Sequence, residues 1–280
     1  MTALSAQDLE RLGLFQGAEH QPFHFDAGRA GALLLHGFPG TPAETRALGE
    51  QFAQMGISAH GMLLPGFGAD IARLSSVTRA DWVNAALEKW RVLRTAHAPA
   101  ILVGYSMGGA VALHLAAQLP PDQLVLFAPF AGVRHVLASL LPVVKHAVRE
   151  IQPFARADFS KPATRAMIAS VLPDANLDDA AVQHALKHQV RVSTQTLHEL
   201  QLLGTRAYQI APQVRAPALI VQGVQDKAVP PLATRQLLLR LGSPVTYCEL
   251  NGTHDLIRLQ DESAAAVVQA VRAFVKTSAQ

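Results

Sequence analysis

Short apolar runs alternate with stretches of helical periodicity along most of the chain. The runs are rich in Leu, Ile and Val, which favours strands buried on both faces of a sheet. They lie at residues 32–36, 57–62, 100–103, 124–128, 218–223 and 245–250, with a possible edge strand at 21–25. Helices are predicted between them, at about 43–55, 81–95 and 110–117. This alternation predicts an α/β fold whose mostly parallel central sheet has helices on both faces.

The pattern changes between residues 131 and 215. Strand signals vanish there and helical periodicity dominates, interrupted by Pro142, Pro153, Pro162, Pro173 and Pro212. We therefore predict a core made of residues 1–130 and 216–280, and a helical cap or lid at 131–215. Most apolar side chains of the cap are expected to pack its own helices together. Leu137 and Leu140 are candidates to contact a ligand under it.

Composition narrows the class of protein. A chain of 280 residues, half of them hydrophobic, can bury one substantial core. The net charge of +3 gives no reason to expect a nucleic-acid partner. Cys248 is the single cysteine, which excludes an intrachain disulfide and leaves this residue without cysteine partners for a metal site. We expect no metal and no cofactor. We expect no leader peptide, because charged residues interrupt the first apolar positions, and no apolar stretch is near the roughly 20 residues of a membrane span. The expected location is cytoplasmic, without stable membrane insertion. Oligomeric state is not readable from the sequence.

The most informative motif is the pentapeptide Gly104-Tyr105-Ser106-Met107-Gly108. It follows the apolar run at 100–103 and precedes the Ala-rich helical segment. A G-x-S-x-G motif between a strand and a helix is typical of a nucleophile elbow, a sharp turn that exposes a serine above a parallel sheet. Ser106 is therefore the candidate nucleophile.

A serine hydroxyl needs a base to take its proton and a carboxylate to orient that base. After such an elbow the expected chain order is Ser, then Asp or Glu, then His. Asp226 follows the run at 218–223, and His254 follows the run at 245–250. We predict His254 as the base and Asp226 as its orienting acid. Asp255 is the rival acid, but adjacent side chains diverge, which favours Asp226.

The reaction also needs donors for a developing oxyanion. The backbone N–H of Met107, directly after the nucleophile, is one candidate. The second is the N–H of Phe38, in the loop that follows the run at 32–36, because Pro39 has no N–H to give. The Phe38 ring is also expected to line the pocket that binds the acyl group, together with Phe130. His36 is expected to bond backbone groups and is assigned no chemistry.

With these motifs the chain resembles the α/β-hydrolase fold, and within it the bacterial carboxylesterase and monoacylglycerol lipase group. The resemblance rests on residues 33–38 with Gly40, on the helix start at 41–44, on residues 104–109, on the loop at 222–226 and on residues 252–254, and it covers about two-thirds of the chain. It implies a helical cap inserted after the sixth strand, a triad at Ser106, Asp226 and His254, and oxyanion donors at Phe38 and Met107. One stretch departs from the group: a Gly-His-Gly turn is replaced by Pro65-Gly66-Phe67-Gly68, which puts an apolar side chain near the site.

The resemblance implies a serine hydrolase that cleaves short- to medium-chain carboxylic esters or monoacylglycerols through an acyl-enzyme on Ser106. Two alternatives stay open at this point. Another triad hydrolase, such as a C–C bond hydrolase or thioesterase, would use the same residues. A binding protein that kept the fold without turnover is the alternative from a different class. The expected partner is a small ester or lipid.

Overall fold

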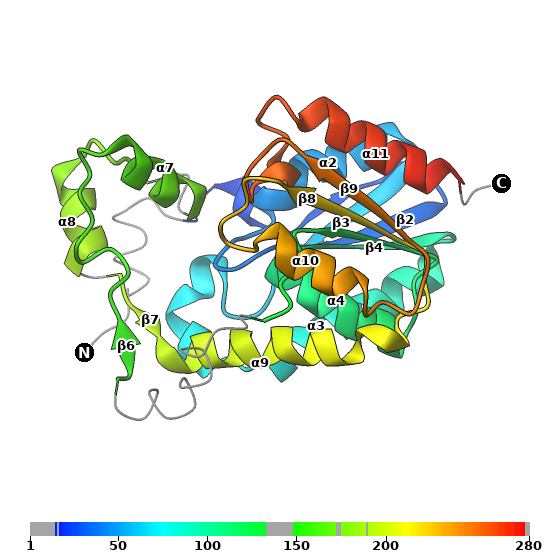
Figure 1. Ribbon diagram of the computed structural model, residues 1–280, viewed down its shortest axis with the longest axis horizontal. Coiled ribbons are helices and arrows are strands. Elements are labelled where there is room, and N and C mark those ends of the chain that lie inside the picture. Colours follow the sequence, from blue (N-terminus) through cyan, green and yellow to red (C-terminus); the bar gives the residue numbers. More distant parts are fainter. Residues whose placement is uncertain (1–14, 16, 133–147, 172–174, 189, 278–280) are drawn as a thin grey trace.

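The computed structural model describes residues 15, 17–132, 148–171, 175–188 and 190–277. Its centre is a seven-stranded sheet in the order β1-β3-β2-β4-β5-β8-β9 (Figure 1). The strands are β1 (Phe23–Phe25), β2 (Ala30–Leu35), β3 (Ile57–Met62), β4 (Ala100–Tyr105), β5 (Gln123–Phe127), β8 (Ala218–Gly223) and β9 (Val245–Leu250). Edge strand β1 runs antiparallel to β3, and every other neighbouring pair is parallel. The predicted sheet and its strands are confirmed.

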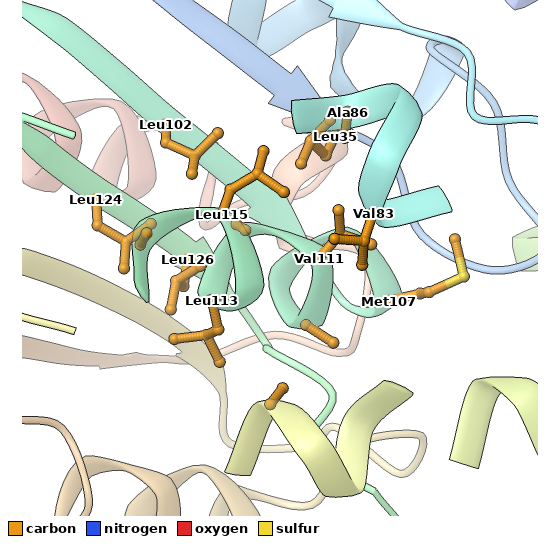
Figure 2. Packing of buried hydrophobic residues seen from close by; sticks show 14 of the residues in the cluster. Leu35, Val83, Ala86, Leu102, Met107, Val111, Leu113, Leu115, Leu124 and Leu126 are labelled. Carbon is orange, nitrogen blue, oxygen red and sulfur yellow. The ribbon is translucent and has the colours of Figure 1, made fainter. Parts of the chain in front are cut away.

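The unbroken apolar runs are explained by helices on both faces of the sheet. Alternate side chains point to opposite faces of a strand. Leu33, Leu35 and Leu102 belong to one buried cluster with α3 (Arg79–Ala96) and α4 (Met107–Gln118), as Figure 2 shows for Leu35 and Leu102. Leu34 and Val103 belong to the other cluster, with α2 (Ala43–Gln54) and α11 (Ala264–Thr277). A strand with helices on each side has no polar face, so its sequence shows no alternation.

A local signal fixes where α3 begins. α3 starts two residues before the predicted Asp81, because Thr78 and Asp81 form a capping box. The Thr78 N–H donates to Asp81 Oδ2 at 2.8 Å, and the Asp81 N–H donates to Thr78 Oγ1 at 3.4 Å. These bonds satisfy backbone donors that the first turn leaves without partners.

The strand order determines where a site can form. The chain passes from β2 outward to β3 and then returns to the opposite side of β2 to enter β4. Such a reversal opens a crevice beyond the carboxyl ends of the two strands. The loop containing Phe38 follows β2, and Ser106 follows β4 directly. The fold thus brings the two predicted loops to one edge of the sheet.

The segment between β5 and β8 contributes no strand to the central sheet in its described part. It holds α7 (Pro162–Val171), α8 (Ala180–His188) and α9 (Thr194–Ile210). It also holds a small antiparallel sheet of two two-residue strands, β6 (Glu150–Ile151) and β7 (Val192–Ser193), which α7 and α8 separate in the chain. The expectation that strands vanish here is wrong for β6 and β7, which are too short to give a periodicity signal. The resemblance implied that this segment follows a sixth strand. In the described residues it follows the fifth strand, β5.

Two parts of this segment pack differently. Phe154, Phe159, Ile168 and Leu186 form a small core of their own around α7 and α8, which lie away from the sheet in Figure 1. In contrast, α9 lies along α3 and α4 and supplies side chains to the main core. The division into a core and a cap at 131–215 stays a prediction.

Candidate active site

Ser106 sits at the turn between β4 and α4 with an unusual backbone conformation. Its φ of 50° and ψ of −113° are strained for a residue with a side chain. The turn is held by hydrogen bonds from the Ser106 N–H to the Phe127 carbonyl and from the Phe130 N–H to the Ser106 carbonyl, both at 2.9 Å. Strain of this kind is stored where a side chain must be presented to a ligand.

The two glycines of the motif are required by close backbone contact. A Cβ on Gly104 would lie 2.5 Å from the Gly108 carbonyl oxygen. A Cβ on Gly108 would lie 2.3 Å from the Leu35 carbonyl oxygen, at the end of β2. The N-terminus of α4 can therefore approach β2 only because these positions lack side chains, and this approach sets Ser106 beside the loop after β2.

His254 and Asp226 meet across 28 positions of sequence. His254 Nδ1 lies 2.7 Å from Asp226 Oδ2. The Asp226 carboxylate is buried, while the imidazole is one-fifth exposed. Asp255, the rival acid, faces elsewhere: it accepts a hydrogen bond from the Tyr105 hydroxyl at 3.1 Å and from Arg258 Nε at 3.3 Å. Of the two candidate acids, Asp226 is therefore the one that contacts the imidazole.

Asp226 is itself fixed by four donors. Its Oδ1 accepts from the N–H groups of Ala228 and Val229, at 2.9 and 2.8 Å. Its Oδ2 accepts from Gln222 Nε2 at 3.0 Å in addition to His254. Gln222 is fully buried at the end of β8 and is held in turn by the Thr234 hydroxyl. Sequence reasoning missed this role of Gln222, for which a polar residue in a buried apolar strand was the signal.

Ser106 and His254 line one cavity of about 230 Å³ at the carboxyl edge of the sheet. Phe38, Met107 and Phe130, which were predicted from the sequence, line it too. Its wall is mostly apolar, with further lining residues Pro39, Glu44, Tyr105, Leu200, Ala228, Val229 and Asp255. Leu137 and Leu140, the other predicted contacts, lie outside the described residues. The cavity therefore gathers the predicted residues that the structure describes, with Asp226 buried behind His254.

His36 anchors the loop that carries Phe38. The Leu64 N–H donates to His36 Nε2 at 3.0 Å, and His36 Nδ1 lies 2.8 Å from the Gly37 carbonyl. Nε2 must therefore be the acceptor and Nδ1–H the donor, which is one neutral tautomer. Burial lowers the pKa of His36 to about 4, partly opposed by the bond to Gly37. The prediction that His36 bonds backbone groups is confirmed.

Phe67, in the stretch that departs from the family pattern, is fully buried. Its ring makes edge contacts with His36 at 5.1 Å and with Phe38 at 5.9 Å between centroids. The apolar ring packs beneath the loop as a support and does not line the cavity.

Four polar residues beside the cavity were given no supporting role from the sequence: Glu44, Tyr105, Asp255 and Arg258. Glu44 is buried in the first turn of α2, and burial raises its pKa, while Arg258 and the Gly37 N–H oppose the shift. Burial also raises the pKa of the Tyr105 hydroxyl, with the carboxylates of Glu44 and Asp255 adding to the shift. A charged residue in a helical first turn is usually a solvated one, so only the fold reveals that Glu44 is buried.

Within the described residues, no helix combines the length and apolar character that a membrane span requires. The same residues contain no group of three or more metal-ligating side chains placed to hold an ion.

Two curated relatives match part of the chain. A thermostable monoacylglycerol lipase of Bacillus sp. (strain H-257) is 35% identical over 111 residues, which cover 40% of this chain and 44% of that protein. A carboxylesterase of Bacillus subtilis (strain 168) is 29% identical over 117 residues, covering 41% and 46%. The matched segments thus span less than half the length of either relative.

Solved structures match almost the whole chain. The structure reported for the metagenome-derived lipolytic enzymes LipS and LipT gives a TM-score of 0.74 at 22% identity, covering 93% of this chain and 98% of that one. A monoacylglycerol lipase of Paleococcus ferrophilus gives 0.69 at 18% identity, covering 92% and 98%. The family model described as serine aminopeptidase, S33 matches residues 27–258. The chain has the α/β-hydrolase fold and belongs to the serine aminopeptidase S33 family.

Proposed function

We propose that this protein is a serine hydrolase of carboxylic esters, acting on short- to medium-chain acyl esters or monoacylglycerols. The observation that carries the proposal is the 2.7 Å contact between Asp226 Oδ2 and Nδ1 of His254, which lines the same cavity as Ser106. A carboxylate on Nδ1 leaves Nε2 as the atom able to take a proton from a serine hydroxyl. The lipase and carboxylesterase relatives support the ester as substrate.

In the proposed mechanism, Ser106 Oγ attacks the acyl carbonyl while His254 takes the hydroxyl proton. Asp226 holds the imidazole and stabilises its charged form. The N–H groups of Phe38 and Met107 stabilise the oxyanion, and Met107 opens α4, where the first N–H groups have no helical partner. His254 then protonates the leaving alcohol, and water cleaves the acyl-enzyme by the same route.

The mostly apolar wall of the cavity suits an acyl chain. An acyl chain bound there would displace water from around the oxyanion. We propose that residues 131–215 act as the cap over this cavity, with Leu137 and Leu140 among the residues that meet the acyl chain. The cytoplasmic location expected from the sequence stays a prediction.

The direct test compares the parent protein with Ser106→Ala. We expect the parent to hydrolyse p-nitrophenyl esters and monoacylglycerols and to be labelled by a fluorophosphonate. Ser106→Ala should lose label and reduce kcat by about 10⁴-fold or more. Ser76→Ala, an exposed serine away from the cavity, is the matched control and should behave as the parent. Ester hydrolysis by Ser106→Ala near the parent rate would refute the proposal.

A substrate panel separates the reaction classes. Esters of graded acyl length, monoacylglycerols, thioesters and a C–C bond substrate are compared by kcat/KM. The proposal predicts that the oxygen esters have the highest kcat/KM. A kcat/KM about tenfold higher for a thioester or a C–C bond substrate would favour the alternative triad hydrolase. Labelling of Ser106 without turnover of any substrate would favour a binding protein.

A further inference from the structure

Glu44 and Arg258 form a buried ion pair beside the cavity that the proposed mechanism does not use. Glu44 Oε1 accepts from Arg258 Nη2 at 3.0 Å, and both side chains are about one-tenth exposed. Glu44 belongs to α2, whereas Arg258 ends the short helix η4 (Leu256–Arg258), 214 positions later in the chain. A pair that joins such distant segments next to a reactive serine has a geometric consequence for the site.

One end of this pair holds the loop after β2. Glu44 Oε2 accepts the Gly37 N–H at 2.8 Å, directly before Phe38 in the chain. The loop also passes close to the carboxylate at Gly40, where an added Cβ would lie 2.1 Å from Glu44 Oε2. The position of the Phe38 backbone is therefore set by where the Glu44 carboxylate is held.

The other end holds the segments that carry the base and the nucleophile. Arg258 Nε donates to Asp255 Oδ1 at 3.3 Å, and the Tyr105 hydroxyl donates to the same oxygen at 3.1 Å. Asp255 directly follows His254, and Tyr105 directly precedes Ser106. The Tyr105 ring also lies against the His254 ring, with 5.0 Å between centroids. A continuous chain of polar contacts thus links the three loops that meet at the cavity.

The chemistry makes the relative position of these loops important. An oxyanion donor contributes about 10²–10³-fold to kcat, and a shift of about 1 Å in a reacting group can remove much of such a gain. A charge-assisted pair with a planar guanidinium restricts both distance and angle more strongly than neutral contacts do. Apolar contacts have no comparable directional preference.

We propose that Glu44 and Arg258 are positioning residues that keep the Phe38 amide aligned with Ser106 and His254 during ester hydrolysis. The inference rests on the proposed function of the site. Neither residue takes or gives a proton in the reaction, and each acts through the loop that it holds. The pair should therefore matter more in the transition state than in substrate binding.

The test measures Glu44→Gln and Arg258→Gln with a p-nitrophenyl ester, with kcat expressed per serine titrated to completion by a fluorophosphonate. We expect kcat to fall about 10- to 100-fold with KM within about threefold, because a displaced oxyanion donor affects the transition state. Affinity for a trifluoromethyl ketone, whose adduct carries an oxyanion, should fall by a similar factor. The double variant should lose no more than the worse single variant, since both changes break one pair.

The chain offers a close control in Glu199, another buried carboxylate. Glu199 Oε2 accepts from the Arg79 N–H at 3.1 Å and from Arg79 Nη1 at 2.7 Å, so it also binds one backbone amide and one guanidinium. It does not line the cavity. Glu199→Gln should keep kcat per titrated serine within about twofold of the parent, and a loss equal to that of Glu44→Gln would overturn the inference.

Parent-like kcat per titrated serine in both Glu44→Gln and Arg258→Gln would also overturn it. If Glu44→Gln does not fold, Arg258→Lys is the deciding variant. Its ammonium keeps the positive charge but lacks the planar set of N–H donors of a guanidinium. An intermediate fall in kcat then supports the proposal, and parent-like kcat refutes it. Failure of the proposed function has a different signature, since it would appear in the parent itself as absent ester hydrolysis or an unlabelled Ser106.

Discussion

Protonation of His36 should destabilise the folded protein between neutral pH and about pH 4. The ring is fully buried, and its Nε2 accepts the Leu64 N–H. A proton on Nε2 would set two donors against each other and would place a charge where water is absent. Burial therefore lowers the pKa of His36 from 6.5 to about 4.

The size of the effect follows from linkage. Because the folded pKa lies below the unfolded value, the unfolded chain binds more protons than the folded protein once the pH falls below 6.5. The contribution of His36 to stability is therefore fully present above pH 6.5 and is lost as the pH falls toward about 4. The difference of about 2.5 in pKa corresponds to roughly 3 kcal/mol in full, and about 2 kcal/mol of it is lost on going from pH 8 to pH 5.

Urea unfolding of the parent and of His36→Gln at several pH values between 8 and 5 checks this. The Gln side chain can accept the Leu64 N–H and does not titrate, so the variant should lose about 2 kcal/mol less than the parent over this range. His60→Gln is the comparison variant, because the pKa of His60 is also lowered to about 4. Burial is the larger cause there, and the nearby charges of His24, His97 and Lys89 add to it. High salt should weaken the His60 contribution and leave that of His36. Equal pH dependence in the parent and in His36→Gln would refute the reasoning.

The sequence predicted the parts of the site that depend on local geometry and chain order. Glycines are needed at positions 104 and 108 because the start of α4 lies close to neighbouring backbone. The motif therefore predicted the turn at Ser106. His254 and Asp226 each follow a parallel strand, and parallel strands end at one edge of a sheet. The contact between them could therefore be expected without coordinates.

The sequence could not predict partners that depend on tertiary packing. Glu44 has the sequence context of a solvated residue in a helical first turn, and only the meeting of α2 with η4 buries it against Arg258. The same holds for α9, whose helical periodicity matches that of α8 although α9 packs on the main core and α8 does not. Periodicity shows that a helix has an apolar face and leaves open which surface that face meets.

Two further substitutions test the geometry of the elbow and the choice of acid. Gly108→Ala should destabilise the fold by about 1–3 kcal/mol or more in urea unfolding, because the new Cβ would lie 2.3 Å from the Leu35 carbonyl oxygen, a backbone atom that cannot move aside. An unchanged midpoint would contradict the close approach of α4 to β2. Asp226→Asn should lower kcat by about 10⁴-fold, since the amide no longer holds the imidazole in the required tautomer. Asp255→Asn should cost at most about tenfold, because Asp255 meets Tyr105 and Arg258 and not the imidazole. Equal losses in kcat for the two variants would mean that the carboxylate at 2.7 Å from His254 does not orient the base.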